Sequence, residues 1–165
     1  MRYAHTIEAI IGSTPLIDLS AIAGGKATIL GKYEASNPGG SVKDRIVLTM
    51  LDAAEADGSL MPGGTVIEPT SGNTGVGLAM LAARRGYKAV LVMPETMSVE
   101  RRQLAASYGA QIVLTPGGEG MSGAVRRADE LRDETPGAIV VGQFVNPANL
   151  CQRSEERRVG KECRS

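Results

Sequence analysis

Lys43 lies at a position in the sequence where its amine could act as a nucleophile. It follows the glycine-rich turn at residues 38–40 and begins an amphipathic segment that predicts a helix over residues 42–56. The positive end of a helix dipole disfavours the protonated form of a lysine held there, and only the neutral amine can form a Schiff base. Lys43 is therefore a candidate Schiff-base lysine. From this turn alone, a solvated lysine at a helix start is the simpler interpretation.

The second segment with functional side chains reads Glu68-Pro69-Thr70-Ser71-Gly72-Asn73-Thr74-Gly75-Val76-Gly77. It joins a predicted strand to a helix that begins near Asn73. Small hydroxyl residues and free backbone N–H groups at a helix N-terminus form a binding site for an anion, either a carboxylate or a phosphate. An ordinary strand-to-helix turn is the alternative. The density of threonine, serine and asparagine in this one turn favours a functional site.

A third segment, residues 118–123, matches the glycine spacing of a dinucleotide-binding loop. Three further residues separate it from the preceding predicted strand. The next strand, near residues 141–144, ends without an acidic residue that could bind a ribose. The motif is therefore a weak indication of nucleotide binding, and a loop ahead of a helix is the preferred interpretation. The run at residues 24–27 also fails as a phosphate-binding P-loop, because Ala27 has no hydroxyl for Mg²⁺.

Alternating strand and helix patterns surround these turns. Strands are predicted at residues 27–35, 65–69, 89–93, 111–114 and 138–141, and helices at residues 42–56, 73–85, 99–108 and 121–134. Ser98 is the expected N-cap of the third helix, and Gly86 and Gly109 are expected helix ends. This order predicts an α/β fold, with an open, twisted, parallel sheet and helices on both faces.

The composition excludes several classes of protein. The 165 residues are 42% apolar and 22% charged, as in one soluble globular domain. Eighteen basic and 18 acidic residues, five aromatic rings of Tyr and Phe and no Trp argue against nucleic acid as a partner. No apolar run could span a membrane or serve as a signal region. Cys151, Cys163 and the single histidine, His5, fit no metal site, so we expect no metal and a reducing cytoplasm.

Five motifs in order resemble one enzyme family. They are Ile11–Leu16, Ser41-Val42-Lys43-Asp44-Arg45, Thr70-Ser71-Gly72-Asn73-Thr74-Gly75, Met93–Ser98 and the run from Gly142-Gln143-Phe144 to Asn149. Together they resemble the cysteine synthases, or O-acetylserine sulfhydrylases, of the β-family (fold type II) of pyridoxal-phosphate enzymes. The resemblance covers residues 1–149 almost continuously.

The resemblance implies a function for each motif. Lys43 is the residue that would bind pyridoxal 5'-phosphate covalently and act as the general base. Asn73 would lie near the 3′-oxygen of the cofactor. The implied substrate-carboxylate site consists of Thr70, Ser71, Gly72, Thr74 and Gln143. The implied reaction is a β-replacement that makes L-cysteine from O-acetylserine and sulfide.

The resemblance also implies a domain layout. Residues 1–44 correspond to the leading segment of a large domain, residues 45–146 to a small α/β domain and residues 147–152 to a connection. The family pattern stops after Asn149, whereas the family continues for about as many residues again. We therefore expect an N-terminal fragment that is inactive alone. One choice of codons for residues 153–163 reproduces a common sequencing adapter, so we expect residues 153–165 to be a non-native tail.

For the whole protein, the resemblance implies a homodimer and the C-terminus of serine acetyltransferase as a partner. Cystathionine β-synthase shares the lysine and asparagine motifs and is the nearest alternative. Serine or threonine dehydratase fits less well, because its usual loop has histidine where Thr74 stands. A non-catalytic small-molecule binding module is the alternative from another class. The choice between O-acetylserine and O-phosphoserine stays open.

Overall fold

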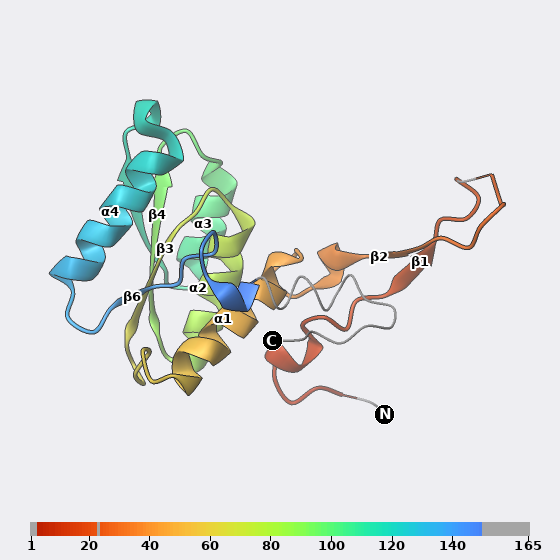
Figure 1. Cartoon of the computed structure of the whole chain (residues 1–165), viewed down its shortest axis with the longest axis horizontal. Helices are drawn as coiled ribbons and strands as arrows, with labels where there is room; N and C mark the ends of the chain where they lie inside the picture. Colours follow the sequence, from red (N-terminus) through yellow and green to blue (C-terminus); the bar gives the residue numbers. More distant parts are fainter. Residues whose placement is uncertain (1–2, 23, 150–165) are drawn as a thin grey trace.

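The structure, a computed structural model, describes residues 3–22 and 24–149 (Figure 1). Its centre is a four-stranded parallel sheet in the order β5-β4-β3-β6. The strands are β3 (Thr65–Pro69), β4 (Lys88–Pro94), β5 (Gln111–Thr115) and β6 (Ile139–Val140). We call residues 43–149, which contain this sheet, the body.

Four helices cover the two faces of the sheet: α1 (Lys43–Ala56), α2 (Asn73–Arg85), α3 (Val99–Ser107) and α4 (Gly120–Glu134). Figure 1 shows α4 on one side of the sheet and the other three on the opposite side. Neighbouring residues of β3 explain the arrangement, because side chains alternate along a strand. Val66 packs among residues of α1 and α2, whereas Ile67 packs against Ala124 and Ala128 of α4. The predicted α/β fold is confirmed.

The body follows its predicted elements closely. The strand over residues 65–69 and the helix over residues 73–85 have the predicted bounds. The Ser98 side chain accepts a hydrogen bond from the Arg101 backbone N–H and caps α3 as predicted. Gly86 ends α2 with a φ of +78°, a conformation that glycine adopts without strain. These element boundaries could therefore be predicted from local capping and turn residues.

Residues 3–22 and 24–42, which we call the arm, depart from the prediction. They contain the 3₁₀ turns η1 (Glu8–Ile10) and η2 (Glu34–Ser36) and the strands β1 (Leu16–Asp18) and β2 (Leu30–Lys32). The predicted strand over residues 27–35 is wrong in both extent and partner. Only three of these residues form a strand, which pairs antiparallel with β1 in a ribbon that projects from the body (Figure 1). Its backbone hydrogen bonds are made with β1, which is close in the sequence, and not with the parallel sheet as predicted. The 3₁₀ turn η2 follows and ends the extended segment.

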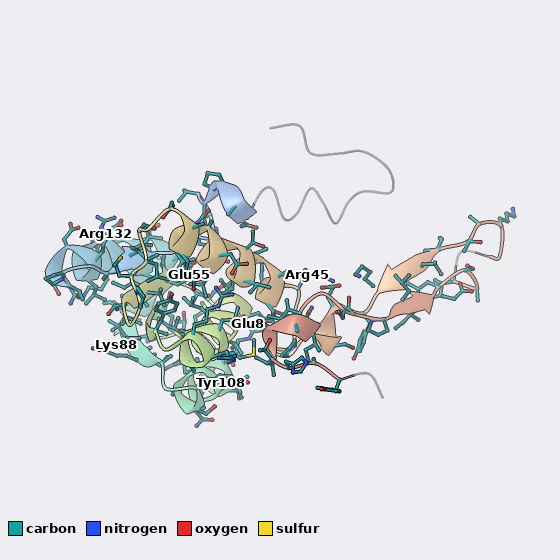
Figure 2. All side chains as sticks on the ribbon, turned by 90° about the horizontal axis from the view of Figure 1, so that it is seen from below. Glu8, Arg45, Glu55, Lys88, Tyr108 and Arg132 are labelled. Atoms are coloured by element: carbon teal, nitrogen blue, oxygen red, sulfur yellow. The ribbon has the colours of Figure 1, made fainter. Side chains whose placement is uncertain are left out.

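A polar network fastens the arm to the start of α1. The Arg45 guanidinium pairs with Glu34 at 2.7 Å and donates to the carbonyl of Gly12 at 2.8 Å. Glu34 also accepts hydrogen bonds from Thr14 at 2.6 Å and from Asn37 at 2.9 Å. Burial by itself raises the pKa of Glu34, but the hydrogen bonds from Arg45, Thr14 and Asn37 outweigh it and lower that pKa from 4.5 to about 2. Figure 2 shows Arg45 where the arm meets the body.

A second ionic contact joins η1 to the body. Arg85, at the end of α2, bonds Glu8 of η1 at 3.0 Å. The same guanidinium bonds Asp52 at 2.7 Å and Glu55 at 3.0 Å on α1. Figure 2 labels Glu8 on the arm and Glu55 on the body. The arm is thus fixed at two points by arginines of the body.

Within the described ranges, no helix is both long and apolar enough to cross a lipid bilayer. The predicted tail at residues 153–165, the end of the predicted connection and both cysteines lie outside the described residues.

Candidate active site

The turn between β3 and α2 contains most of the predicted binding residues. Thr70 and Thr74 are buried, whereas Ser71 and Asn73 are exposed. The backbone N–H of Thr70 donates to the carbonyl of Val92 on β4 at 2.9 Å, which fixes the turn to the neighbouring strand. The Thr70 hydroxyl accepts a hydrogen bond from the Gly72 N–H at 3.2 Å. The turn therefore has a defined shape at the carboxyl end of the sheet, where parallel α/β sheets bind their ligands.

The start of α2 leaves backbone donors free. The first helical hydrogen bonds run from Gly75 and Val76 to the carbonyl of Gly72. Among the described residues, no hydrogen bond is made by the backbone N–H groups of Ser71, Asn73 and Thr74. Free N–H groups at the positive end of a helix dipole bind anions. The turn thus has the donors that the predicted anion site requires.

Gly75 allows α2 to lie close to the sheet. A methyl group added to it would lie 2.7 Å from Cγ2 of Thr70 and 3.1 Å from Cδ1 of Leu91. Both neighbours are buried and packed, so neither can easily move away. The close approach holds the first turn of α2 against the end of β3.

Gln143 reaches this turn from a distant part of the chain. It follows β6, is buried, and its Oε1 accepts a hydrogen bond from the Thr74 hydroxyl at 2.6 Å. Its Nε2 donates to the carbonyl of Pro69 at 3.5 Å. The single hydroxyl proton of Thr74 is therefore used by Gln143, whose side-chain NH₂ group lies beside the carbonyl of Pro69 and the carboxylate of Glu68. The structure brings these two predicted residues into contact.

Glu68 is a residue of this region that the sequence did not single out. Its side chain is fully buried and accepts backbone hydrogen bonds from Gly142 at 2.7 Å and from Gln143 at 3.3 Å. Burial raises the pKa of Glu68 from 4.5 to about 7, although these hydrogen bonds act in the opposite direction. The available signal was a carboxylate inside an otherwise apolar strand, which requires a buried partner.

Lys43 is the first residue of α1 and is half-buried. Its backbone N–H donates to the Ser41 hydroxyl at 3.1 Å, which fixes the turn before the helix. Within residues 3–22 and 24–149, its amine has no ion pair or hydrogen bond. A half-buried amine without a competing carboxylate fits the covalent attachment of a carbonyl cofactor.

Asp44 fixes the same turn from inside. It is fully buried, and its Oδ2 accepts the backbone N–H of Gly39 at 2.5 Å. Burial raises the pKa of Asp44 against the effect of that hydrogen bond. A methyl group added to Gly77 would lie 3.5 Å from Cα of Asp44, so the start of α1 packs on the second turn of α2. Lys43 and the Thr70–Thr74 turn therefore lie at the same end of the body.

Arg101 is a second residue that the sequence did not assign to this site. A methyl group added to Gly72 would lie 2.8 Å from Nη1 of Arg101, so the guanidinium lies over the turn. Arg102 instead donates to the carbonyls of Glu95 and Met97, which shape the loop before α3. The cation of Arg101 adds to the positive end of α2 and favours an anionic ligand.

The third glycine-rich segment is organised differently. Residues 117–119 form the 3₁₀ turn η3, and the backbone N–H of Gly117 donates to Glu95 at 3.0 Å. Among the described residues, no group of three or more His, Cys, Asp or Glu could hold a metal ion. The residues present fit an organic cofactor better, because Lys43 offers an amine and Asn73 an exposed amide at neighbouring helix starts.

Residues 7–155 match the pyridoxal-phosphate dependent enzyme family. The chain is 51% identical over 150 residues to a cysteine synthase of a Flavobacterium species, covering 91% of this chain and 48% of that protein. It is 54% identical over 144 residues to a cysteine synthase of Staphylococcus aureus, covering 87% of this chain and 46% of that protein. The chain spans about half the length of the curated relatives it matches.

Solved structures of similar proteins have the same fold. O-ureido-L-serine synthase is 46% identical with a TM-score of 0.87, over 93% of this chain and 48% of that chain. Cysteine synthase (OASS) from Entamoeba histolytica is 41% identical with a TM-score of 0.86, over 92% of this chain and 46% of that chain. The likeness includes the arm as well as the body, because it covers more of the chain than the body contains.

Proposed function

The chain belongs to the family of pyridoxal-phosphate dependent enzymes, and we propose on that basis that the protein containing it makes L-cysteine from O-acetylserine and sulfide by β-replacement. One observation carries the proposal. Gln143 bonds Thr74 at the open start of α2, beside the helix start that bears Lys43. A carboxylate site next to an unpaired amine is suited to an amino-acid substrate.

Lys43 and Asn73 would hold the cofactor. When bound, pyridoxal phosphate supplies an electron sink for negative charge that develops on Cα of the substrate. Lys43, once released by the substrate amine, would take the Cα proton as general base and later return it. In the net reaction, the bond from Cβ to acetate breaks and a bond from Cβ to sulfur forms.

The Thr70–Thr74 turn and Gln143 would bind the substrate carboxylate. The backbone N–H groups of Ser71, Asn73 and Thr74 supply donors, and Gln143 lies at the same turn, where its Oε1 holds the Thr74 hydroxyl. Because Gly72 has no side chain, the guanidinium of Arg101 can lie over the turn, where it adds a positive charge. Fixing the carboxylate in this way orients the Cα proton, and orientation of that kind accounts for a large share of an enzyme's rate enhancement.

The domain division, the oligomeric state, the protein partner and the location are also proposals. We propose that residues 1–44 belong to a larger domain, residues 45–146 to a small α/β domain and residues 147–152 to the connection between them. The projecting arm and the aliphatic cores on both faces of the body's sheet support this division. A homodimer, an interaction with serine acetyltransferase and a cytoplasmic location rest on the resemblance to cysteine synthases.

The test measures cysteine formation from O-acetylserine and sulfide by the full-length protein that contains this chain. Lys43→Ala should lower kcat by about 10²–10⁴-fold, the usual contribution of a general acid–base group. Lys88→Ala is the control, because Lys88 lies on β4 at the opposite end of the strands from the turn (Figure 2), and it should change kcat less than about twofold. A Lys43→Ala protein with the wild-type rate would contradict the proposal.

A further inference from the structure

Gln143 owes its position to the backbone groups on either side of it. β6 is only two residues long and pairs with β3 through Val66 and Ile67, and one further backbone bond, from the N–H of Val141 to the carbonyl of Ile67 at 2.9 Å, ends this pairing at Val141. After Val140 the chain turns at Gly142, whose φ is +72°. Some other contact must therefore hold residues 142–143 against the end of β3.

Glu68, on β3, supplies that contact through its side chain. Its two oxygens accept two consecutive backbone N–H groups, one from Gly142 at 2.7 Å and one from Gln143 at 3.3 Å. The carboxylate is fully buried, so water does not compete for these bonds. Consecutive amides held by one carboxylate fix both the position and the rotation of the peptide that begins Gln143.

The other polar groups of Gln143 complete the arrangement. Its carbonyl accepts a hydrogen bond from Asn149 at 2.5 Å, and its side chain bonds Thr74 and the carbonyl of Pro69. Pro69 is the residue directly after Glu68 on β3. The end of β3 therefore contacts Gln143 through both its backbone and its side chain.

We propose that Glu68 is a positioning residue that holds Gln143 for carboxylate binding at the start of α2. The inference rests on the proposed function, since it assumes that the Thr70–Thr74 turn binds a carboxylate. Its effect is indirect, because Glu68 is fully buried and bonds Gly142 and Gln143, not the exposed residues of the turn.

The experiment uses NMR of the full 165-residue chain at pH 8, with sodium acetate as the carboxylate probe. Glu68→Gln keeps the size of the side chain but replaces one acceptor oxygen by an NH₂ group, which cannot accept a backbone N–H. The contact between the Thr74 methyl group and the Gln143 side-chain amide should then be lost. The dissociation constant of acetate, followed at the amides of Ser71, Asn73 and Thr74, should rise about tenfold, as for one lost hydrogen bond.

Glu95→Gln is the matched control. Glu95 also accepts the backbone N–H of a glycine, Gly117, but on the loop after β4 and without contact to Gln143. This variant should leave the acetate affinity within about twofold of the wild type, as for a substitution outside the site. Glu68→Asp, which keeps the charge but has a shorter reach, replaces Glu68→Gln if that variant does not fold, with the same expected result.

The outcomes separate the two proposals. An unchanged Thr74–Gln143 contact, or an acetate affinity within about twofold of the wild type in the Glu68 variant, would overturn the role of Glu68. Acetate that shifts none of the three amides in the wild-type chain would overturn the proposed carboxylate site itself. A loss of affinity in the Glu95 variant as large as that in the Glu68 variant would also overturn the specific role of Glu68.

Discussion

The arm and the body are held together by different forces. The body has an aliphatic core on each face of its sheet, and Leu51, Leu78, Leu81 and Leu91 are fully buried in the larger of the two. The large apolar side chains of the arm are mostly exposed, with Leu16 at 59%, Ile22 at 84% and Leu30 at 54%. The arm is held mainly by the Arg45 network and the Arg85 contact with Glu8, and of its apolar side chains Ile11 packs against the core of the body. Apolar packing therefore determines the body, whereas the arm is held chiefly by charge and hydrogen bonding.

The largest expected effect is on the free energy of unfolding when one leucine is truncated in each region. Leu91→Ala should lower the free energy of unfolding by about 2–5 kcal/mol, because Leu91 is fully buried between α2 and the sheet. Leu30→Ala should change it by less than about 0.5 kcal/mol, since Leu30 is exposed on the ribbon. Urea denaturation of both variants measures the difference. Equal losses would show that the arm shares the core of the body.

Breaking the polar network should release the arm without unfolding the body. Arg45→Met leaves Glu34 partly buried without its cation, which costs about 3 kcal/mol for a buried pair. The backbone amide of Gly12, which donates to Asn37 in this network, should exchange with solvent about a hundredfold faster. Hydrogen exchange followed by mass spectrometry measures this.

Arg126→Met provides the control for that variant. Arg126 pairs with Glu119 on the exposed surface of α4, and such pairs contribute less than about 1 kcal/mol. Gly12 exchange should be unchanged in this protein. Unchanged Gly12 exchange in Arg45→Met as well would mean that the network does not hold the arm.

The two regions should respond to pH in opposite directions. Glu68 has a pKa raised from 4.5 to about 7, so the folded body binds a proton that the unfolded chain releases. The stability that it contributes is present below pH 4.5 and is lost as the pH rises through 7, by roughly 3 kcal/mol at most. Glu34 has a pKa lowered to about 2, so its contribution is present above pH 4.5 and is lost as the pH falls toward 2.

Urea denaturation between about pH 4 and 8 tests the first half of this prediction. The slope between about pH 4.5 and 7 should become much shallower in Glu68→Gln, since that variant has no carboxyl at this position and the raised pKa of Asp44 remains. Exchange of the Gly12 amide at falling pH tests the second half, after correction for intrinsic exchange. A slope as steep in Glu68→Gln as in the wild type would assign the titration to another group.

The sequence predicted the body better than the arm for a physical reason. The helix over residues 73–85 has an apolar pattern, a glycine end and a turn rich in small polar residues, and all three signals agree. The strand over residues 27–35 had apolar composition alone, and composition does not specify which strand it pairs with. The strand that it pairs with lies nearby in the sequence, and Asp18 is opposite Leu30 in the observed pair. Composition gave no reason to prefer this partner to a distant one.

The site was predictable where a single turn contains it. Thr70, Ser71, Asn73 and Thr74 are close together in the sequence, so their density was visible. Gln143 was identified by resemblance, because its contact with Thr74 requires β6 to return beside β3. The partners of Glu68 depend on that same return, so its function could not be predicted from local sequence.

The proposed function requires Lys43 to be the residue that binds the cofactor. The most direct measurement incubates the protein with pyridoxal 5'-phosphate, reduces it with borohydride and maps the pyridoxyl group by peptide mass spectrometry. The other lysines in the described part of the chain are Lys26, Lys32 and Lys88, none of which starts a helix next to the anion-binding turn. We predict the pyridoxyl group on Lys43. Its presence on any other lysine in place of Lys43 would contradict the account.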